Sequence, residues 1–132
     1  MTDIDPFDPG HAALAFMSER HLGCLTTMRA DGSPHVVPVG FYFDADARVV
    51  RIITQRTSVK ARNAARGGRA AVTQFDGARW LTLEGDVSLV TDTAGIALAV
   101  QAYTLRYQAP RSQRAATRVG IEVRVDRMMG NA

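Results

Sequence analysis

The sequence predicts a mainly β fold, a six-stranded antiparallel barrel with two or three helices at its periphery. Several segments alternate apolar and polar residues over the length of a strand, as half-buried strands of antiparallel sheets do. Tight-turn signals such as Asp31-Gly32 and Asp76-Gly77 join neighbouring strands. Strands and helices do not alternate at the regular spacing of a parallel sheet, which favours the barrel. The chain has 132 residues, and we expect residues 1–132 to form one domain.

The first part of the chain combines an acidic start, one helix and two strands. In order, it predicts a loose lead-in over residues 1–9, a helix over residues 10–20, a strand over residues 21–28 and a strand over residues 35–43. The last of these contains Pro38 and Gly40. Such residues within a strand indicate either a bulge at a barrel corner or a place where another group approaches the backbone closely.

The remaining elements follow from a β-branched run, two helix caps and clean alternation. Val49, Val50, Ile52 and Ile53 indicate a buried strand, and Thr57 or Ser58 can cap a helix that Gly67-Gly68 ends. Beyond this point the sequence predicts strands over residues 70–75 and 80–90, a helix capped by Thr91 or Asp92 and reaching about residue 107, a polar loop over residues 108–117 and a last strand over residues 118–128.

Positive charge is concentrated in one stretch near the middle of the chain. Residues 48–75 contain seven cations and no carboxylate, while the whole chain has 16 basic and 13 acidic residues. The seven are Arg48, Arg51, Arg56, Lys60, Arg62, Arg66 and Arg69. Lys60 is the single lysine beside 15 arginines, and lysine binds phosphate as a compact charge. A helix start here would offer free N–H groups to an anion, although a short arginine-rich helix can also be a solvated face.

Other features of the sequence exclude several classes of protein. No apolar run has the length of a membrane span and no secretory leader is present, and the lone Cys24 suits a cytoplasmic location. The histidines are scattered, so we expect no metal site. Nucleic acid is not the expected partner, because the cations are not spread over a face with interleaved aromatic residues. Motifs of serine hydrolases, P-loop proteins and dinucleotide-binding folds are missing from the sequence, so the protein either binds a ligand or lets a cofactor perform the chemistry.

Four segments in order resemble a known family. They are L-x-x-L-T-T-x-R-x-D-G-x-P-H from Leu22, V-x-P-V-G-F-x-F-D from Val36, R-I-I-T-x-x-x-S-x-K-x-R-N from Arg51 and Q-x-D-G-x-R-W-L-x-L-E-G from Gln74. Together they resemble the pyridoxamine-phosphate-oxidase-like split-barrel flavoproteins, in the branch that uses the deazaflavin coenzyme F-420. The F-420-dependent biliverdin reductases contain segments similar to two in this chain, S-E-R-H-L and D-G-A-R-W-L-x-L-E-G. The resemblance spans about residues 13–128.

The resemblance implies an FMN-binding split-barrel type of fold, a homodimer and a role for individual residues. Thr54, Ser58, Lys60 and Arg62 would hold the cofactor phosphate, and Asn63 would brace that turn or reach the cofactor tail. The backbone of Pro38, Val39 and Gly40 would lie against the ring, with Ile53 beside it. Gln74, Arg79 and Trp80 would reach the cofactor from the partner subunit. Arg111, Arg114 and Arg118 are candidates for the carboxylates of a tetrapyrrole substrate or of an acidic cofactor tail.

The resemblance implies a hydride transfer from reduced F-420 to a conjugated acceptor, with biliverdin, a linear tetrapyrrole, first among the candidates. Two alternatives use the same anion site. The cofactor could be FMN, as in the oxidase branch, or the protein could bind F-420 or a tetrapyrrole without catalysis. The sequence identifies no general acid, and water would suffice as the proton source.

Overall fold

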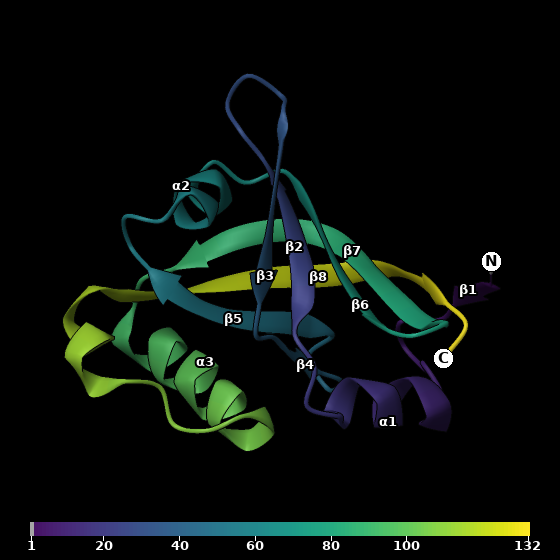
Figure 1. Ribbon diagram of the computed structural model, residues 1–132. Helices are drawn as coiled ribbons and strands as arrows, with labels where there is room; N and C mark the ends of the chain where they lie inside the picture. Colours follow the sequence, from purple (N-terminus) through teal and green to yellow (C-terminus); the bar gives the residue numbers. More distant parts are fainter. Residues whose placement is uncertain (1) are drawn as a thin grey trace.

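The computed structural model describes residues 2–132, which form a curved antiparallel sheet with helices around it (Figure 1). The strands are β1 (Thr2–Ile4), β2 (Gly23–Met28), β3 (Pro34–Val39), β4 (Tyr42–Asp44), β5 (Val49–Gln55), β6 (Arg69–Asp76), β7 (Arg79–Val90) and β8 (Arg118–Gly130). The helices are α1 (His11–Ser18), α2 (Val59–Ala65), α3 (Thr93–Arg106) and the 3-10 helix η1 (Ser112–Thr117). No helix within residues 2–132 is both long and apolar enough to cross a bilayer.

All strand pairs are antiparallel, in the order β3-β2-β6-β7-β8-β5-β4, and β1 pairs with the end of β8. The two edge strands β3 and β4 follow each other in the chain, so the sheet curls until its edges are neighbours. In Figure 1 α3 lies beside β5, α1 lies near β4, and α2 lies next to the tip of β5, away from α1. The mainly β antiparallel fold with peripheral helices is therefore confirmed.

The strand count differs from the predicted six because two short strands were not expected. Thr2–Ile4, within the expected lead-in, pairs with β8 as β1. The expected strand over residues 35–43 is divided into β3 and β4 at Gly40 and Phe41. The Phe41 N–H donates to the Tyr107 hydroxyl at 3.2 Å instead of joining a strand ladder, which explains the break.

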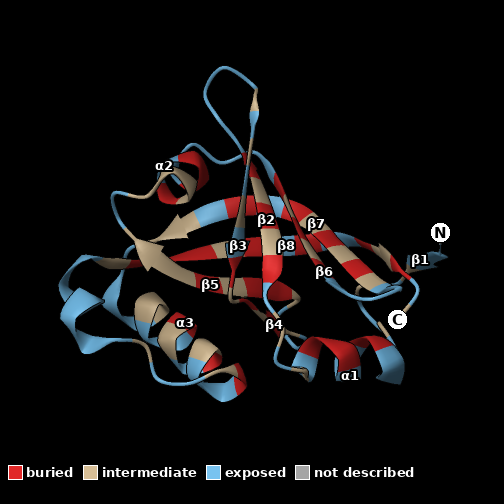
Figure 2. Ribbon diagram, viewed as in Figure 1, coloured by how far each residue is buried: buried red, intermediate tan, exposed pale blue. Residues whose placement is uncertain are grey.

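The core lies inside the curl, where the alternating strands direct their apolar side chains. Figure 2 shows buried residues alternating with exposed ones along β7 and β8. In β7, Leu81, Leu83 and Val87 are buried, as the sequence pattern predicts. Other large buried side chains come from α1, from β2, β5, β6 and β8, and from the break between β3 and β4: Phe16, Leu25, Phe41, Val50, Ile52, Val72, Ile121 and Met128. The barrel is filled by side chains, so a ligand has to bind at its rim.

Candidate functional site

A cavity of about 440 Å³ opens at the rim, where the ends of β3 and β5 approach each other. The barrel side of the cavity is formed by Pro38, Val39 and Gly40 of the β3 end and by Ile53, Thr54 and Gln55 of the β5 end. The other side is formed by Lys60, Tyr103, Gln108, Ala109, Pro110, Arg111, Arg114 and Arg118. Four separate parts of the chain therefore meet around this space.

The wall formed by Pro38–Gly40 depends on the absence of a side chain at Gly40. A Cβ atom there would lie 2.8 Å from Cε2 of Tyr103 and 3.1 Å from Cε2 of Tyr107. The two tyrosine rings of α3 therefore pack directly on the backbone at this point. Of the two explanations for Gly40, close approach by another group is correct, and the group is the protein's own aromatic pair.

Hydrogen bonds from Arg106 and Tyr107 hold the backbone next to this wall in position. The Tyr107 hydroxyl donates to the His21 carbonyl oxygen at 2.6 Å, and burial raises the pKa of this phenol. The Arg106 guanidinium donates to the Phe41 carbonyl oxygen at 2.6 Å. The same group donates to the Glu19 carbonyl oxygen at 3.0 and 2.8 Å and to Gln74 Oε1 at 2.5 Å. Arg106 is thus a buried cation that joins α1, β6 and the β3–β4 break, and burial lowers its pKa.

The cavity is strongly cationic, because Lys60, Arg111, Arg114 and Arg118 line it and no carboxylate does. Lys60 is half-buried, and its burial lowers the pKa of the ammonium group. Within residues 2–132, no carboxylate lies at ion-pair distance from Lys60. An ammonium group that is partly desolvated and has no counter-ion favours an anionic ligand.

The hydroxyl groups beside Lys60 form a short chain that begins α2. The Thr54 hydroxyl donates to Ser58 Oγ at 3.0 Å, and Ser58 Oγ accepts from the Ala61 N–H at 3.2 Å. Ser58 is therefore the residue that caps α2. Asn63 is buried and donates to Thr27 Oγ1 at 2.9 Å, which holds α2 on β2 and fits the predicted bracing role.

Nine of the 15 residues singled out in the sequence line this one cavity: Pro38, Val39, Gly40, Ile53, Thr54, Lys60, Arg111, Arg114 and Arg118. Ser58 and Asn63 lie behind the lining on α2, and Arg62 is exposed on the same helix. Sequence reasoning did not single out Gln55, Tyr103 and residues 108–110. Tyr103 and Tyr107 have helical spacing, but that pattern alone does not distinguish a core contact from a cavity wall.

Gln74, Arg79 and Trp80 do not line this cavity. Gln74 is fully buried, and its amide group donates to the Phe16 carbonyl oxygen at 2.9 Å. Arg79 binds both carboxylate oxygens of Glu19 at 2.8 and 2.9 Å. Trp80 is half-buried on β7. The structure of one chain therefore leaves their role toward a second subunit as a prediction.

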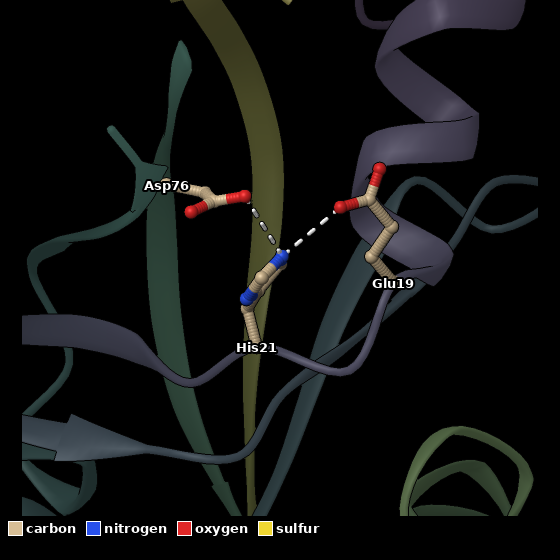
Figure 3. Close-up of side chains that lie close together, drawn as sticks. All are labelled: Glu19, His21 and Asp76. Carbon is tan, nitrogen blue, oxygen red and sulfur yellow. Dashed lines mark hydrogen bonds and ion pairs between the residues drawn. The ribbon is translucent and has the colours of Figure 1, made fainter. Parts of the chain in front are cut away.

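Arg79 belongs to a charged cluster with Glu19, His21 and Asp76. The sequence did not predict this cluster, because the three histidines are scattered along it. His21 Nε2 lies 3.0 Å from Glu19 Oε1 and 3.7 Å from Asp76 Oδ2 (Figure 3). These three residues have ligand atoms close enough for one metal ion. However, the Arg79 guanidinium binds both carboxylates, with 2.7 Å to Asp76 Oδ2. Hydrogen bonds from Arg79, and then from His21, lower the pKa of Glu19 to about 2. Arg79 therefore already supplies a positive charge to both carboxylates that a metal ion would need.

We expect this cluster to contribute to acid sensitivity. The folded-state pKa of Glu19 is below its ordinary value of 4.5, so its stabilising effect is present above about pH 4.5 and is lost as the pH falls toward 2. Thermal unfolding of Glu19→Gln should therefore show a shallower loss of Tm between pH 5 and pH 2 than the unmodified protein. Asp46→Asn, at an exposed carboxylate without an ion pair in the described chain, is the control. Equal slopes for all three proteins would contradict the role of Glu19.

Comparison with known proteins agrees with this geometry. The family model described as pyridoxamine 5'-phosphate oxidase matches residues 10–130. An F420H(2)-dependent biliverdin reductase of Mycobacterium tuberculosis (strain CDC 1551 / Oshkosh) is 51% identical over 120 residues, which are 91% of this chain and 86% of that protein.

Solved structures show the same fold. A conserved hypothetical protein from Mycobacterium tuberculosis superposes with a TM-score of 0.78 at 21% identity, over 98% of this chain and 89% of the other. An F420 reductase superposes with a TM-score of 0.73 at 27% identity, over 92% and 98%. The resemblance carried by the four sequence segments is confirmed: this chain belongs to the pyridoxamine 5'-phosphate oxidase family.

Proposed function

We propose that the protein is a reductase that binds the deazaflavin coenzyme F-420 in the cavity between β3 and β5 and reduces a conjugated acceptor, with biliverdin first among the candidates. The observation that carries the proposal is a cavity that is lined by four cations, by no carboxylate and by Pro38–Gly40. The 51% identity to an F420H(2)-dependent biliverdin reductase supports the same choice of cofactor and acceptor.

The residues present fit a flat, anionic cofactor. The cavity volume of about 440 Å³ is within the usual range for small-molecule sites, roughly 300–1,000 Å³. The backbone at Pro38–Gly40 and the Ile53 side chain give one side an apolar wall for a ring. Lys60 lines the same cavity and offers an ammonium donor to a phosphate. Ring and phosphate would thus contact different parts of the same space.

We call Thr54, Ser58 and Lys60 the anion seat. Lys60 supplies the charge, Thr54 lines the cavity, and Ser58 holds the Thr54 hydroxyl in place. Arg62 is exposed on α2 and acts as an outer charge, while Asn63 keeps α2 on β2. Because Thr54, Ser58 and Asn63 are already held by hydrogen bonds, these three side chains lose little freedom on binding.

The cofactor supplies a hydride when it is bound in reduced form, and the chain itself orients the two reactants. Arg111, Arg114 and Arg118 face the same cavity from the segment around η1. They can bind the propionates of a tetrapyrrole, or instead the acidic tail of the cofactor. No carboxylic acid lines the cavity, so we assign the proton to water held by these arginines.

A second copy of the chain would complete the site. The outward-facing side of β3 and β6 exposes Val36 and Phe75, which are 57% and 63% accessible. This face suits a homodimer interface, because burying such residues stabilises association. In that dimer the partner's β6–β7 turn would bring Arg79 and Trp80 toward the cavity. Gln74 is enclosed in its own protomer and would support that turn from within.

An anaerobic assay with reduced F-420 and biliverdin tests the proposal. We expect the biliverdin absorbance band to decline as oxidised F-420 appears, at a rate proportional to enzyme concentration. Matched reactions with FMN and a chemical reductant test the alternative cofactor. Saturable binding of F-420 without turnover of any acceptor would favour a binding protein, and a tightly held yellow flavin after purification would favour the FMN branch.

A further inference from the structure

His35 is a titratable side chain beside the anion seat that the proposed function does not use. It lies on β3 directly opposite Thr27 of β2. Its Nδ1 atom is buried and has no hydrogen-bond partner among the residues that the structure describes. A buried polar atom without a partner is uncommon in folded proteins and calls for an explanation.

The position of α2 places Lys60 on the helix face that lies toward this histidine. Asn63 donates to Thr27 Oγ1 at 2.9 Å, so this side of α2 lies over the β2 residue that pairs with His35. Lys60 is three residues before Asn63 and therefore lies on the same side of the helix. Lys60 also lines the cavity, so it connects the His35 neighbourhood to the space where a ligand binds.

The charged groups around His35 are mainly cations. They are Arg29, which follows β2 and donates to the Pro34 carbonyl oxygen, and Lys60 of α2. The carboxylate in the same hairpin, Asp31, is bonded to Ser33. Burial first, and then the charges of Arg29 and Lys60, lower the pKa of His35 below 6.5. The free protein therefore keeps this imidazole neutral near pH 7.

We propose that His35 is a fourth, protonatable member of the anion seat, and that it takes up one proton when a phosphate or sulfate group binds beside Lys60. The anion offsets the repulsion from Lys60 and Arg29, so the imidazolium becomes favourable in the bound state. Proton uptake then couples pH to affinity, because both events favour the same state. The inference rests on the proposed anion seat but not on the identity of the cofactor.

The direction in which pH changes the affinity follows from the pKa values of His35 in the free protein and in the complex. The pKa of His35 is low in the free protein and higher in the complex, so affinity increases as the pH falls from the bound-state value to the free-state value. A rise of one pKa unit corresponds to an affinity gain of about tenfold across that interval. At pH values above the pKa of His35 in the complex, protonation of His35 should no longer affect the affinity for the anion.

The test is a pH titration of the histidine imidazoles by NMR in the wild-type protein. It is carried out on the free protein, with sodium sulfate, and with F-420, at constant ionic strength. Sulfate keeps its charge throughout pH 5–8, so any proton uptake belongs to the protein. His11 and His21 lie outside the anion seat and are internal controls for general screening. His35→Gln assigns the resonance and should remove the pH dependence of affinity.

The expected result is a rise of about one unit in the pKa of His35 with either anion, and a much smaller change for the two controls. Lys60→Met should raise the pKa of His35 in the free protein and abolish the response to sulfate. A response to sulfate without F-420 binding would support the inference and overturn the proposed cofactor. F-420 binding with an unchanged His35, or equal shifts of all three histidines, would overturn the inference and leave the cofactor assignment intact.

Discussion

Replacing Lys60 with methionine is expected to weaken F-420 binding by about 10- to 100-fold. A hydrogen bond to a charged group contributes about 1.5–3 kcal/mol, and each 1.4 kcal/mol corresponds to about tenfold in affinity. Lys60 lines the cavity and has no competing carboxylate in the described chain, so its charge is available to the ligand. Methionine keeps an unbranched apolar side chain of good helix propensity, which leaves α2 intact. Fluorescence titration of F-420 measures the change.

The matched control is Arg56→Met, which removes one positive charge from the turn between β5 and α2. Arg56 is exposed and does not line the cavity, so affinity should change by less than about threefold, the effect of an exposed charge. If both variants weaken binding equally, general attraction by the cationic stretch explains binding and the anion seat is wrong. If neither does, the cofactor binds elsewhere.

Replacing Arg106 with methionine should reduce the free energy of unfolding by about 3–5 kcal/mol, because three acceptors, two of them buried, lose this donor. These acceptors are the carbonyl oxygens of Glu19 and Phe41 and the Gln74 amide oxygen. The guanidinium also lies over the Phe41 ring, with 4.6 Å between its Cζ atom and the ring centroid, and that contact is lost as well. Urea unfolding measures the effect.

Arg127→Met provides the comparison for the same chemical change on an exposed part of β8. Its unfolding free energy should stay within about 0.5 kcal/mol of the wild type. A loss at Arg106 that is no larger than the loss at Arg127 would show that water replaces the missing donor. The stability of the β3–β4 break would then depend on Tyr107 alone.

Local features of the fold could be predicted because they depend on neighbouring residues. The run Val49–Ile53, the cap at Ser58 and the stop at Gly67-Gly68 describe β5 and α2 without knowledge of the rest of the chain. The alternation in β7 also agrees with its buried and exposed faces. The family resemblance added what periodicity could not, because it linked Pro38–Gly40 to Lys60 in one cavity.

Contacts between distant residues were not predictable from patterns. In the sequence, Arg106 is an ordinary cation in the last turn of a helix. In the structure, its guanidinium donates a hydrogen bond to the carbonyl oxygen of Glu19, 87 positions away. Tyr107 meets Phe41 across 66 positions, and this contact divides one expected strand into two. The pairing of Thr2–Ile4 with β8 likewise depends on where the other end of the chain lies. Each of these contacts results from closure of the barrel. The periodicities of strands and helices, two and 3.6 residues, carry no information about contacts between distant parts of the chain.

The 3-10 helix η1 has no buried residue, although the two strands that form the opposite wall of the cavity run into the core. Substitutions in this segment therefore alter one wall while the barrel keeps its stability. Acceptor preference can diverge between relatives, or be redesigned in directed evolution, through Ser112–Thr117 and its flanks. The residues proposed to bind the cofactor would stay unchanged, because they belong to the barrel strands and to the start of α2.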